Sequence, residues 1–509
     1  MAQQLQQITI TAPGFAGINT QDAPLAQEPT FASVADNCVI DKSGRIASRK
    51  GYSMVSTNGG SVLGSSLGIE AIHQFRDNNG NVVIFSAGNS KIFSGTTTLT
   101  DETPGSYTIT DDNWKIVNFN GKAYFFQRSH EPLVYSNTAG AVQKMSAHAG
   151  ATGTPPQGNE VLAAFGRIWV ADFATDKSTI YWSDLLDGTA WTGGTSGSID
   201  ISKVWPNGYD EIVALSAHNG FLIIFGKDSI LVYGGADSPA TMALTDTISN
   251  MGCLGRDCVV STGKDLIFFA KSGIRSLART IQEKSSPIGD ISKNVNNDIK
   301  TIAASETGNI KMIYSPKEAF VLVNFQILKI VYCFDTRFPL QDGSYRATTW
   351  SQIAPLCFTN LVDNTIYIGN ASGIAQYSGY SDNSSSFQLS YFSHPLSFGN
   401  PSVLKFLKKI NVVTFDGAES TVVLNWAYDY TNNYKKQAYI LPANKSAQYN
   451  ISEYNTDAEY SGSLDLIKRK KVNTSGSGMV VSVGVESTVD GNVIAIQQLN
   501  IHALLGRIA

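Results

Sequence analysis

Short apolar runs separated by turns dominate the chain, and the stretch from Glu160 to Gly235 shows their arrangement most clearly. Its second half holds three apolar runs, residues 210–218, 221–225 and 229–233, with Asn219-Gly220 between the first two. Asn-Gly between apolar runs is typical of a two-residue hairpin turn, because both residues tolerate a positive φ. The pattern therefore predicts a unit of three consecutive antiparallel strands.

The same three-strand unit recurs along the chain at intervals of 41 to 54 residues. Its first turns lie at Gly80, Gly121, Gly166, Gly220, Gly263, Lys317 and Asp363. Four-stranded propeller blades repeat at about 40 to 50 residues. The second strands are apolar at consecutive positions, as expected of blades that a neighbour covers on each face, so residues 221–225 should be buried on both faces.

We therefore predict an all-β chain with a β-propeller of about seven or eight blades. An eighth blade would come from residues 94–110 or from the divergent stretch after Leu277. The alternative is a large sandwich of unrelated hairpins. Residues 61–395 are assigned to the propeller.

Two different regions flank the propeller. Residues 1–60 form an N-terminal arm and hairpin: the Pro-containing residues 1–34 are either a disordered terminus or an extended segment on a neighbouring subunit, and residues 35–52 predict a hairpin. Residues 396–509 alternate apolar and polar positions, which predicts a separate antiparallel β-domain, a sandwich. Within it, the run Lys468-Arg469-Lys470-Lys471 is either a phosphate-facing loop or a solvated hairpin end.

Charge and cysteine content narrow the classes of function. Only 16% of residues are charged and the net charge is −4, which argues against a protein that grips nucleic acid through its overall charge. The cysteines are odd in number and form no Cys-x-x-Cys pair, so we expect reduced core residues. They are Cys38, Cys253, Cys258, Cys333 and Cys357. No run of about 18 apolar residues and no signal-peptide pattern is present, so no membrane span is expected.

Two short motifs match catalytic patterns but lack the context that the chemistry needs. Gly64-Ser65-Ser66-Leu67-Gly68 matches the G-x-S-x-G nucleophile elbow, yet it lies in a Ser/Gly-rich linker instead of between a strand and a helix. Gly226-Lys227 is followed by Asp228, where a Walker A loop needs Ser or Thr.

Other candidates for chemistry are equally incomplete. Residues 183–191 approach a sialidase Asp box, but Asp187 and Gly188 are adjacent where that motif separates them by one residue. The six histidines are scattered without metal-ligand spacing. They are His73, His130, His148, His218, His394 and His502. We therefore predict no catalytic, cofactor-binding or metal-binding residue, no cofactor and no enzymatic activity, since a propeller alone implies none.

The segment Ala35 to Tyr52 (ADNCVIDKSGRIASRKGY) resembles the opening of the tail nozzle proteins, or tail tubular proteins, of short-tailed bacteriophages. Its Asp41, Gly44, Arg45, Arg49 and Gly51 carry the resemblance. Later segments agree in order: FGRIWVADFATDKSTIYWSDLLDGTAWT (165–192), FLIIFGKDSILVYGG (221–235), CVVSTGKDLIFFAKSGIRSL (258–277) and IQQLNIHALLGRIA (496–509). Together they imply a propeller-containing virion protein and no catalytic signature.

The resemblance implies a structural virion protein that forms a sixfold ring below the portal and adaptor, retains packaged DNA and conducts it during ejection. The implied partners are further copies of the chain, portal and adaptor proteins, tail fibres or tailspikes, and genomic DNA passing without sequence-specific binding. The implied location is the virion tail, after assembly in the host cytoplasm. A near-neutral to acidic wall suits this role, because it lets the DNA backbone slide.

Two further expectations follow from this resemblance and from the propeller. The ring wall should consist of the C-terminal domain together with residues 35–60, with the propeller outside or below it. The alternative function is a propeller that binds or cleaves host-surface glycans, as a receptor-binding protein or a depolymerase.

Overall fold

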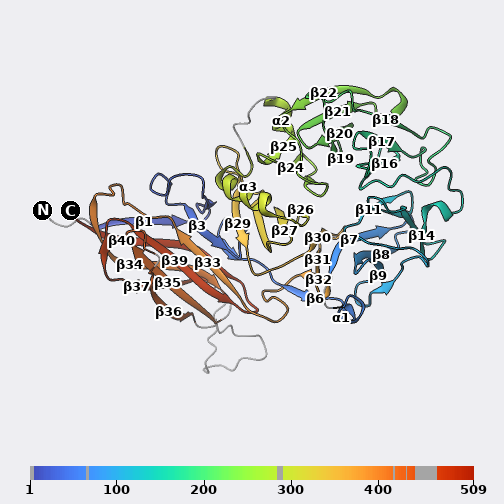
Figure 1. The fold of residues 1–509 in the computed structure, drawn as a ribbon. Coiled ribbons are helices and arrows are strands. Elements are labelled where there is room, and N and C mark those ends of the chain that lie inside the picture. Colours follow the sequence, from blue (N-terminus) through green and yellow to red (C-terminus); the bar gives the residue numbers. More distant parts are fainter. Residues whose placement is uncertain are drawn as a thin grey trace.

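The computed structural model describes residues 5–64, 68–283, 290–416, 419–431, 433–441 and 467–508. Strands take 49% of the chain and helices 6%, which confirms the all-β class. Figure 1 shows two bodies side by side: a ring of small sheets, and a body of two larger sheets that holds both termini.

Six small separate sheets form the ring, which confirms the β-propeller. Five of them follow the chain order of their strands, and the sixth adds a strand from the N-terminal region. The sheets are β7 (Ile69–Arg76), β8 (Val82–Gly88), β9 (Lys91–Ser94), β10 (Thr100–Asp101); β11 (Lys115–Phe119), β12 (Lys122–Phe126), β13 (Leu133–Ser136), β14 (Val142–Lys144); β15 (Glu160–Ala164), β16 (Arg167–Ala171), β17 (Thr179–Trp182), β18 (Gly197–Asp200); β19 (Ile212–His218), β20 (Phe221–Gly226), β21 (Ser229–Gly234), β22 (Ala243–Ser249); β23 (Val259–Ser261), β24 (Leu266–Ala270), β25 (Gly273–Ser276); and β30 (Cys357–Asn360), β31 (Ile366–Asn370), β32 (Gly373–Tyr377), β6 (Tyr52–Met54).

The expected number of seven or eight blades is wrong, because the unit at Lys317 is not a separate sheet. That unit folds as β26 (Ile310–Ser315), β27 (Phe320–Phe325), β28 (Ile330–Asp335) and β29 (Arg346–Trp350). Its first strand lies in the ring beside β23 and β30. Its last strand, however, pairs with an N-terminal strand of the second body, so the unit is part of a ten-stranded sheet.

No eighth blade forms at either expected place. The stretch after Leu277 folds as α2 (Leu277–Glu283) and α3 (Asn296–Ser305), and residues 94–110 contribute only the two-residue strand β10 to the first blade. The remaining helical elements are short: α1 (Gly59–Val62), η1 (Met145–Ala147), η2 (Pro239–Thr241) and η3 (Lys293–Val295).

The predicted turns and buried strands are confirmed. Each of the seven expected first turns joins the first two strands of its unit. At Asn219-Gly220 both residues have a positive φ, 49° and 82°, as a two-residue hairpin turn requires. On β20 the side chains from Leu222 to Phe225 are buried on both faces, while Phe221, at the start of the strand, is 36% exposed.

The second body is a sandwich of two sheets whose inner faces share one hydrophobic cluster. The seven-stranded sheet contains β37 (Ile467–Asn473), β34 (Val403–Asp416), β40 (Ile494–Ile508), β5 (Ile46–Ser48), β4 (Cys38–Ile40), β1 (Leu5–Thr11) and β38 (Ser477–Gly478). The ten-stranded sheet continues from β29 through β3 (Phe31–Asp36), β33 (Phe387–Ser393), β39 (Val481–Val489), β35 (Ser420–Tyr428) and β36 (Lys435–Leu441), with β2 (Gly17–Ile18) beside β3.

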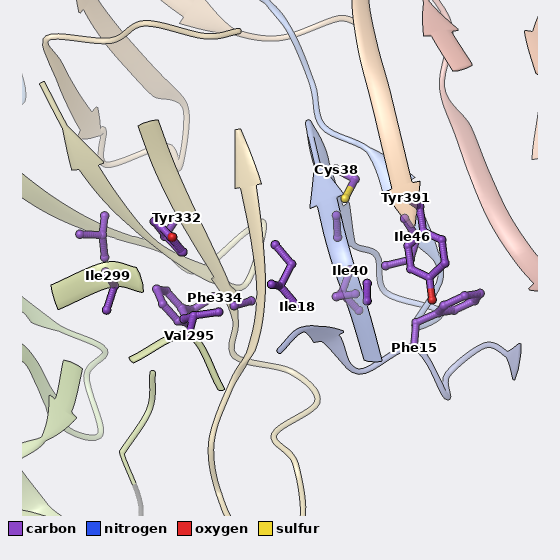
Figure 2. Packing of buried hydrophobic residues seen from close by; sticks show 14 of the residues in the cluster. Phe15, Ile18, Cys38, Ile40, Ile46, Val295, Ile299, Tyr332, Phe334 and Tyr391 are labelled. Atoms are coloured by element: carbon purple, nitrogen blue, oxygen red, sulfur yellow. The ribbon is translucent and has the colours of Figure 1, made fainter. Parts of the chain in front are cut away.

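Strands from both ends of the chain connect the two bodies. β6 completes a propeller blade by pairing with β32, and β3 joins β29 of the ring to β33 of the sandwich. Figure 2 shows the core that results: Val295 and Ile299 near α3 lie by Tyr332 and Phe334 of β28, and Ile40 and Tyr391 follow on the sandwich side. The two bodies therefore share a continuous core.

The N-terminal arm packs on its own chain. β1 pairs along its whole length with β40, and Gly17 and Ile18 pair with Phe31 and Ala32 of β3. A disordered terminus is therefore wrong for Leu5–Thr11. The hairpin expected in residues 35–52 is confirmed as β4 and β5.

Candidate functional site

A polar cavity on the inner side of the ring is the candidate site. It has a volume of about 450 Å³, and charged side chains of both signs line it, among them Arg128, Asp172, Arg256, Asp257 and Glu306. A smaller cavity of about 170 Å³ adjoins it, lined by the first strands β7, β11, β26 and β30. The innermost strands of the blades therefore meet around charged groups and not around a purely apolar core.

One ion pair links two neighbouring blades at this place. The ammonium group of Lys115 donates to both carboxylate oxygens of Glu160, at 2.7 and 2.6 Å, and the backbone N–H of Leu215 on the next blade donates to Glu160 at 2.8 Å. Glu160 is fully buried. Burial raises the pKa of Glu160, and the charge of Lys115 opposes this.

A second ion pair, Arg256 with Asp257, also lines the cavity. The guanidinium of Arg256 donates to Asp257 at 3.2 and 2.9 Å and to the side-chain oxygen of Asn159 at 2.9 Å. Burial opposes ionisation of Asp257, but the charges of Arg256 and Lys311 outweigh it and hold the pKa of Asp257 well below its usual range. Asp257 is therefore an anion in the fold.

Asp172, which also lines the cavity, accepts from three donors. Lys177 donates to it at 2.6 Å, Asn159 donates at 2.9 Å, and Arg128 donates as well. The polar groups thus largely satisfy one another. One exception is Asn113, whose buried side-chain oxygen has no partner among the described residues.

In this arrangement the charged side chains of the cavity pair with one another, within and between blades. The cations in the pairs described above each bind a carboxylate. None of these cations is therefore free to stabilise a negative charge that develops during a reaction. In the described parts of the chain, no three His, Cys, Asp or Glu side chains come together as a metal site. The cavity has the size and polarity to hold a small polar molecule.

The residues of the resemblance form a joint between propeller and sandwich. Arg49 is fully buried, and its guanidinium donates to both carboxylate oxygens of Asp382, at 2.8 and 2.7 Å, and to the side chain of Asn37 at 3.1 Å. The same guanidinium lies 4.0 Å from the ring centre of Phe387 on β33. Because β33 belongs to the sandwich and Asp382 follows the last blade, Arg49 ties the two bodies together.

The other positions of that motif are also structural. Asp41 accepts from Arg45 at 2.6 Å across the hairpin turn. Gly44 has a φ of +73°, and a Cβ there would lie 2.3 Å from Pro13. A Cβ on Gly51 would lie 2.0 Å from the carbonyl oxygen of Ser381. Larger residues would disrupt the joint at both glycines.

The structure does not gather the sequence candidates into one site. Ser65, Ser66 and Leu67 of the elbow match lie outside the described residues. Lys227 and Asp228 form the turn between β20 and β21, and Asp187 caps a turn by accepting from Thr189 at 2.9 and 2.7 Å. The histidines lie on separate elements, and the five cysteines are free and buried, as predicted.

The basic run is neither a loop nor a hairpin end, because Lys468 to Lys471 lie within strand β37. Sequence analysis also missed the charged ring at the cavity, although a signal exists. Lys115, Glu160, Asp257 and Lys311 each stand six residues before the first turn of their unit. Four of the seven units, otherwise apolar, carry a charge at this position. The recurring charge indicates the innermost strand of a blade.

Comparisons with known proteins give no family. No protein-family profile and no curated protein matches the chain. Among solved structures, the chain is similar to YCF48 bound to a D1 peptide (9% identity, 62% of this chain and 93% of that chain, TM-score 0.35). It is also similar to a Lactobacillus plantarum protein (15%, 64% and 91%, 0.38) and the Neurospora crassa Pan2 WD40 domain (8%, 65% and 95%, 0.36).

One further observation concerns membranes. Within the described ranges, no helix has the length and apolar character needed to span a bilayer.

Proposed function

We propose that this protein is a structural component of a short phage tail, a nozzle that forms a ring below the portal and adaptor. In this role it retains the packaged DNA and conducts it during ejection. The observation that carries the proposal is the pair of basic strands at which the two sandwich sheets end. The resemblance of residues 35–52 supplies the sixfold order and the tail partners.

The two terminal strands are β36 and β37, one at the end of each sandwich sheet. β36 begins with Lys435 and Lys436, and Arg469, Lys470 and Lys471 are exposed on β37. A terminal strand presents backbone N–H and C=O groups to a partner. The β37 strands of two copies carry like charges, which would oppose pairing between them. The β37 edge therefore favours contact with a different surface of the neighbouring copy.

The propeller region carries a net charge of the opposite sign. Residues 61–395 contain 23 Lys and Arg against 29 Asp and Glu, a net charge of −6. Residues 396–509 contain 11 against 9, a net charge of +2. A basic edge that meets an acidic region of the next copy makes a heterologous contact, and such contacts generate rings when the rotation closes.

Mass measurement of the purified full-length chain tests the proposal. We expect a discrete ring of six copies, or a monomer that assembles into such a ring on a portal and adaptor complex. The ring should dissociate at high salt, because charge pairing between exposed groups is screened. A chain that stays monomeric in both settings would contradict the proposed function.

The polar cavity supports the second candidate function, binding or cleavage of surface glycans. A cavity of about 450 Å³ with charged and amide groups fits a small sugar. Turnover of host polysaccharide by the purified chain, lost on Asp257→Asn with the fold intact, would favour this candidate. Absence of both binding and turnover would leave the structural role.

A further inference from the structure

A polar patch lies on the outward face of the seven-stranded sheet, between the apolar pairs Leu5–Leu504 at one end and Phe415–Ile467 at the other. The inward positions on β34, such as Ile410 and Val412, are buried in the sandwich core. The alternate positions on the four adjacent strands β37, β34, β40 and β1 therefore face away from it, in three rows of four paired residues. We call these twelve positions the outer lattice.

Three cations stand in the outer lattice. Lys409 pairs in register with His502, Lys471 pairs with Asn411, and Arg469 occupies the third row. Among the described residues, none of the three cations forms an ion pair. Arg469 and Lys471 are exposed, and Lys409 is half-buried. Their positive charge is therefore available to an external partner.

The centre of the outer lattice holds polar groups that the fold leaves unsatisfied. Asn411 and His502 are 3% and 7% exposed, and the side-chain oxygen of Asn411 and Nδ1 of His502 have no partner in the described chain. Burial, together with the charges of Lys409 and Arg469, lowers the pKa of His502, so its imidazole is neutral near pH 7. Buried polar atoms without partners are rare. An Nδ1–H of His502 can donate to a phosphate oxygen, whereas the Asn411 oxygen is itself an acceptor.

The residue types of the outer lattice select the class of partner. None of the twelve positions is Asp or Glu and none is Phe, Tyr or Trp; besides the three cations they carry Asn, Gln, Thr, His and one Val. Cations and amides with no carboxylate suit phosphate oxygens. The outer lattice has no Phe, Tyr or Trp, and its one imidazole, that of His502, is 7% exposed, which argues against stacking on unpaired bases as the mode of binding.

We propose that the outer lattice binds the sugar–phosphate backbone of duplex DNA. The inference rests on the proposed function in one respect, because DNA in the ring is the polyanion that would reach this face. Lys471 and Arg469 alternate along one strand, about 7 Å apart. A row of cations at this spacing can follow one DNA strand while β36 and β37 meet neighbouring copies by their edges.

Three cations make a weak contact that allows sliding. Each neutralised phosphate adds about −0.9 to the slope of log Kobs against log salt, so the outer lattice should give a slope of about −2.7 per copy. Contacts this few give non-specific affinity only. A channel that conducts DNA needs weak, non-specific contacts of this kind.

Fluorescence anisotropy of the full-length chain with a labelled random-sequence duplex, over a series of KCl concentrations, tests the inference. We expect the double variant Arg469→Gln/Lys471→Gln to lose affinity at least tenfold at low salt. Its salt slope should become shallower by about 1.8, because two phosphate contacts are removed. Both residues are exposed, so the variant should fold.

Lys470→Gln is the matched control. It removes the same kind of charge from the same strand, but Lys470 pairs with Val412 and lies over the ring of Tyr439 at 5.4 Å, on the other side of the sheet. The control should leave the salt slope unchanged. Equal loss in the control and in the double variant, or wild-type binding by the double variant, would overturn the inference.

Two further measurements distinguish failure of this inference from failure of the proposed function. Competition by poly-glutamate as strong as by unlabelled DNA would show a general anion surface and overturn the assignment to phosphodiester. Mass measurement of the same samples reports the ring independently. A ring without DNA binding contradicts only this inference, whereas DNA binding by a chain that never forms a ring contradicts only the proposed function.

Discussion

In the propeller many charged side chains form ion pairs, several of them around the polar cavity, whereas on the edge and outward face of the sandwich Lys409, Arg469 and Lys471 form no ion pair among the described residues. Among the described residues, ten cations of residues 61–395 form ion pairs with carboxylates. In the C-terminal domain, the corresponding interaction is Lys436 with Glu486 at 3.4 Å. On our proposal, the paired charges stabilise the propeller, whereas the unpaired cations of the sandwich meet partners.

The same contrast holds for the backbone. The propeller closes on itself through neighbouring blades, which leaves short edges. The sandwich sheets end in β36 and β37, each seven residues long. Substitutions in the propeller should therefore affect stability, and those on the exposed face and edge of the sandwich should affect association.

The largest effect is expected for Ile223→Asp. Ile223 is 2% exposed on β20, so the variant buries an unpaired carboxylate at a cost of several kcal/mol. Thermal unfolding checks this, with Phe221→Asp as control, because Phe221 on the same strand is 36% exposed. A native-like Ile223→Asp protein would contradict the assignment of β20 to a blade covered on both faces.

Arg49→Met should have the next largest effect, because it leaves Asp382 buried without its partner. We expect a loss of about 3–5 kcal/mol in the free energy of unfolding. The double variant Arg49→Met/Asp382→Leu should recover part of this loss, since the unpaired charge is gone. If the single variant unfolds like the wild type in a denaturant titration, the joint does not depend on this pair.

Glu160→Gln should destabilise the propeller less, by about 1–3 kcal/mol. The amide keeps an oxygen for the N–H of Leu215 but loses the charge that pairs with Lys115. The control is Lys271→Gln, whose pair with Asp228 is exposed and worth at most about 1 kcal/mol. Equal losses of stability in the two variants would show that the ion pair at the centre of the ring contributes no more than an exposed ion pair.

The smallest effect, of opposite sign, is expected for Asp112→Asn. Burial raises the pKa of Asp112 to about 6; the N–H of Ser90 opposes this and Glu70 adds to it. The folded chain therefore holds this proton more tightly than the unfolded chain, and the wild type loses stability as the pH rises from about 4 through about 6.

The variant has no charge to bury at this position, and its side-chain oxygen can still accept from Ser90. It should be about 1–2 kcal/mol more stable than the wild type at pH 7. The gain should vanish below about pH 4, where Asp112 is protonated in both states. Unfolding curves at several pH values check this, and a gain that does not change with pH would contradict the assignment of the shift to Asp112.

Local patterns in the sequence predicted much of this fold. Asn219-Gly220 identified a hairpin because its conformational requirement is local, and the apolar run from Leu222 to Phe225 identified a strand covered on both faces. Pairing between distant segments was not predictable in this way. No local pattern in Tyr52–Met54 or Phe31–Asp36 indicates which strand it pairs with. The first segment nevertheless completes a blade, and the second joins the ring to the sandwich.

The same limit applies to the sites. The run of basic residues at 468–471 was visible, but only the register of β37 with β34 divides it between two sides of a sheet. The ion pairs at the centre of the ring were predictable in part, since Lys115 and Glu160 stand at the same place in consecutive units. Which of these charges meet depends on ring closure, and the sequence alone does not show it.

Zero-length cross-linking of carboxylates to amines, on rings assembled from isotopically labelled and unlabelled copies, tests most directly whether assembly runs through the sandwich. We predict links between copies that join Lys435, Lys436, Lys470 or Lys471 to Asp or Glu side chains of residues 61–395. Links between copies confined to the propeller, with none at β36 or β37, would contradict this account.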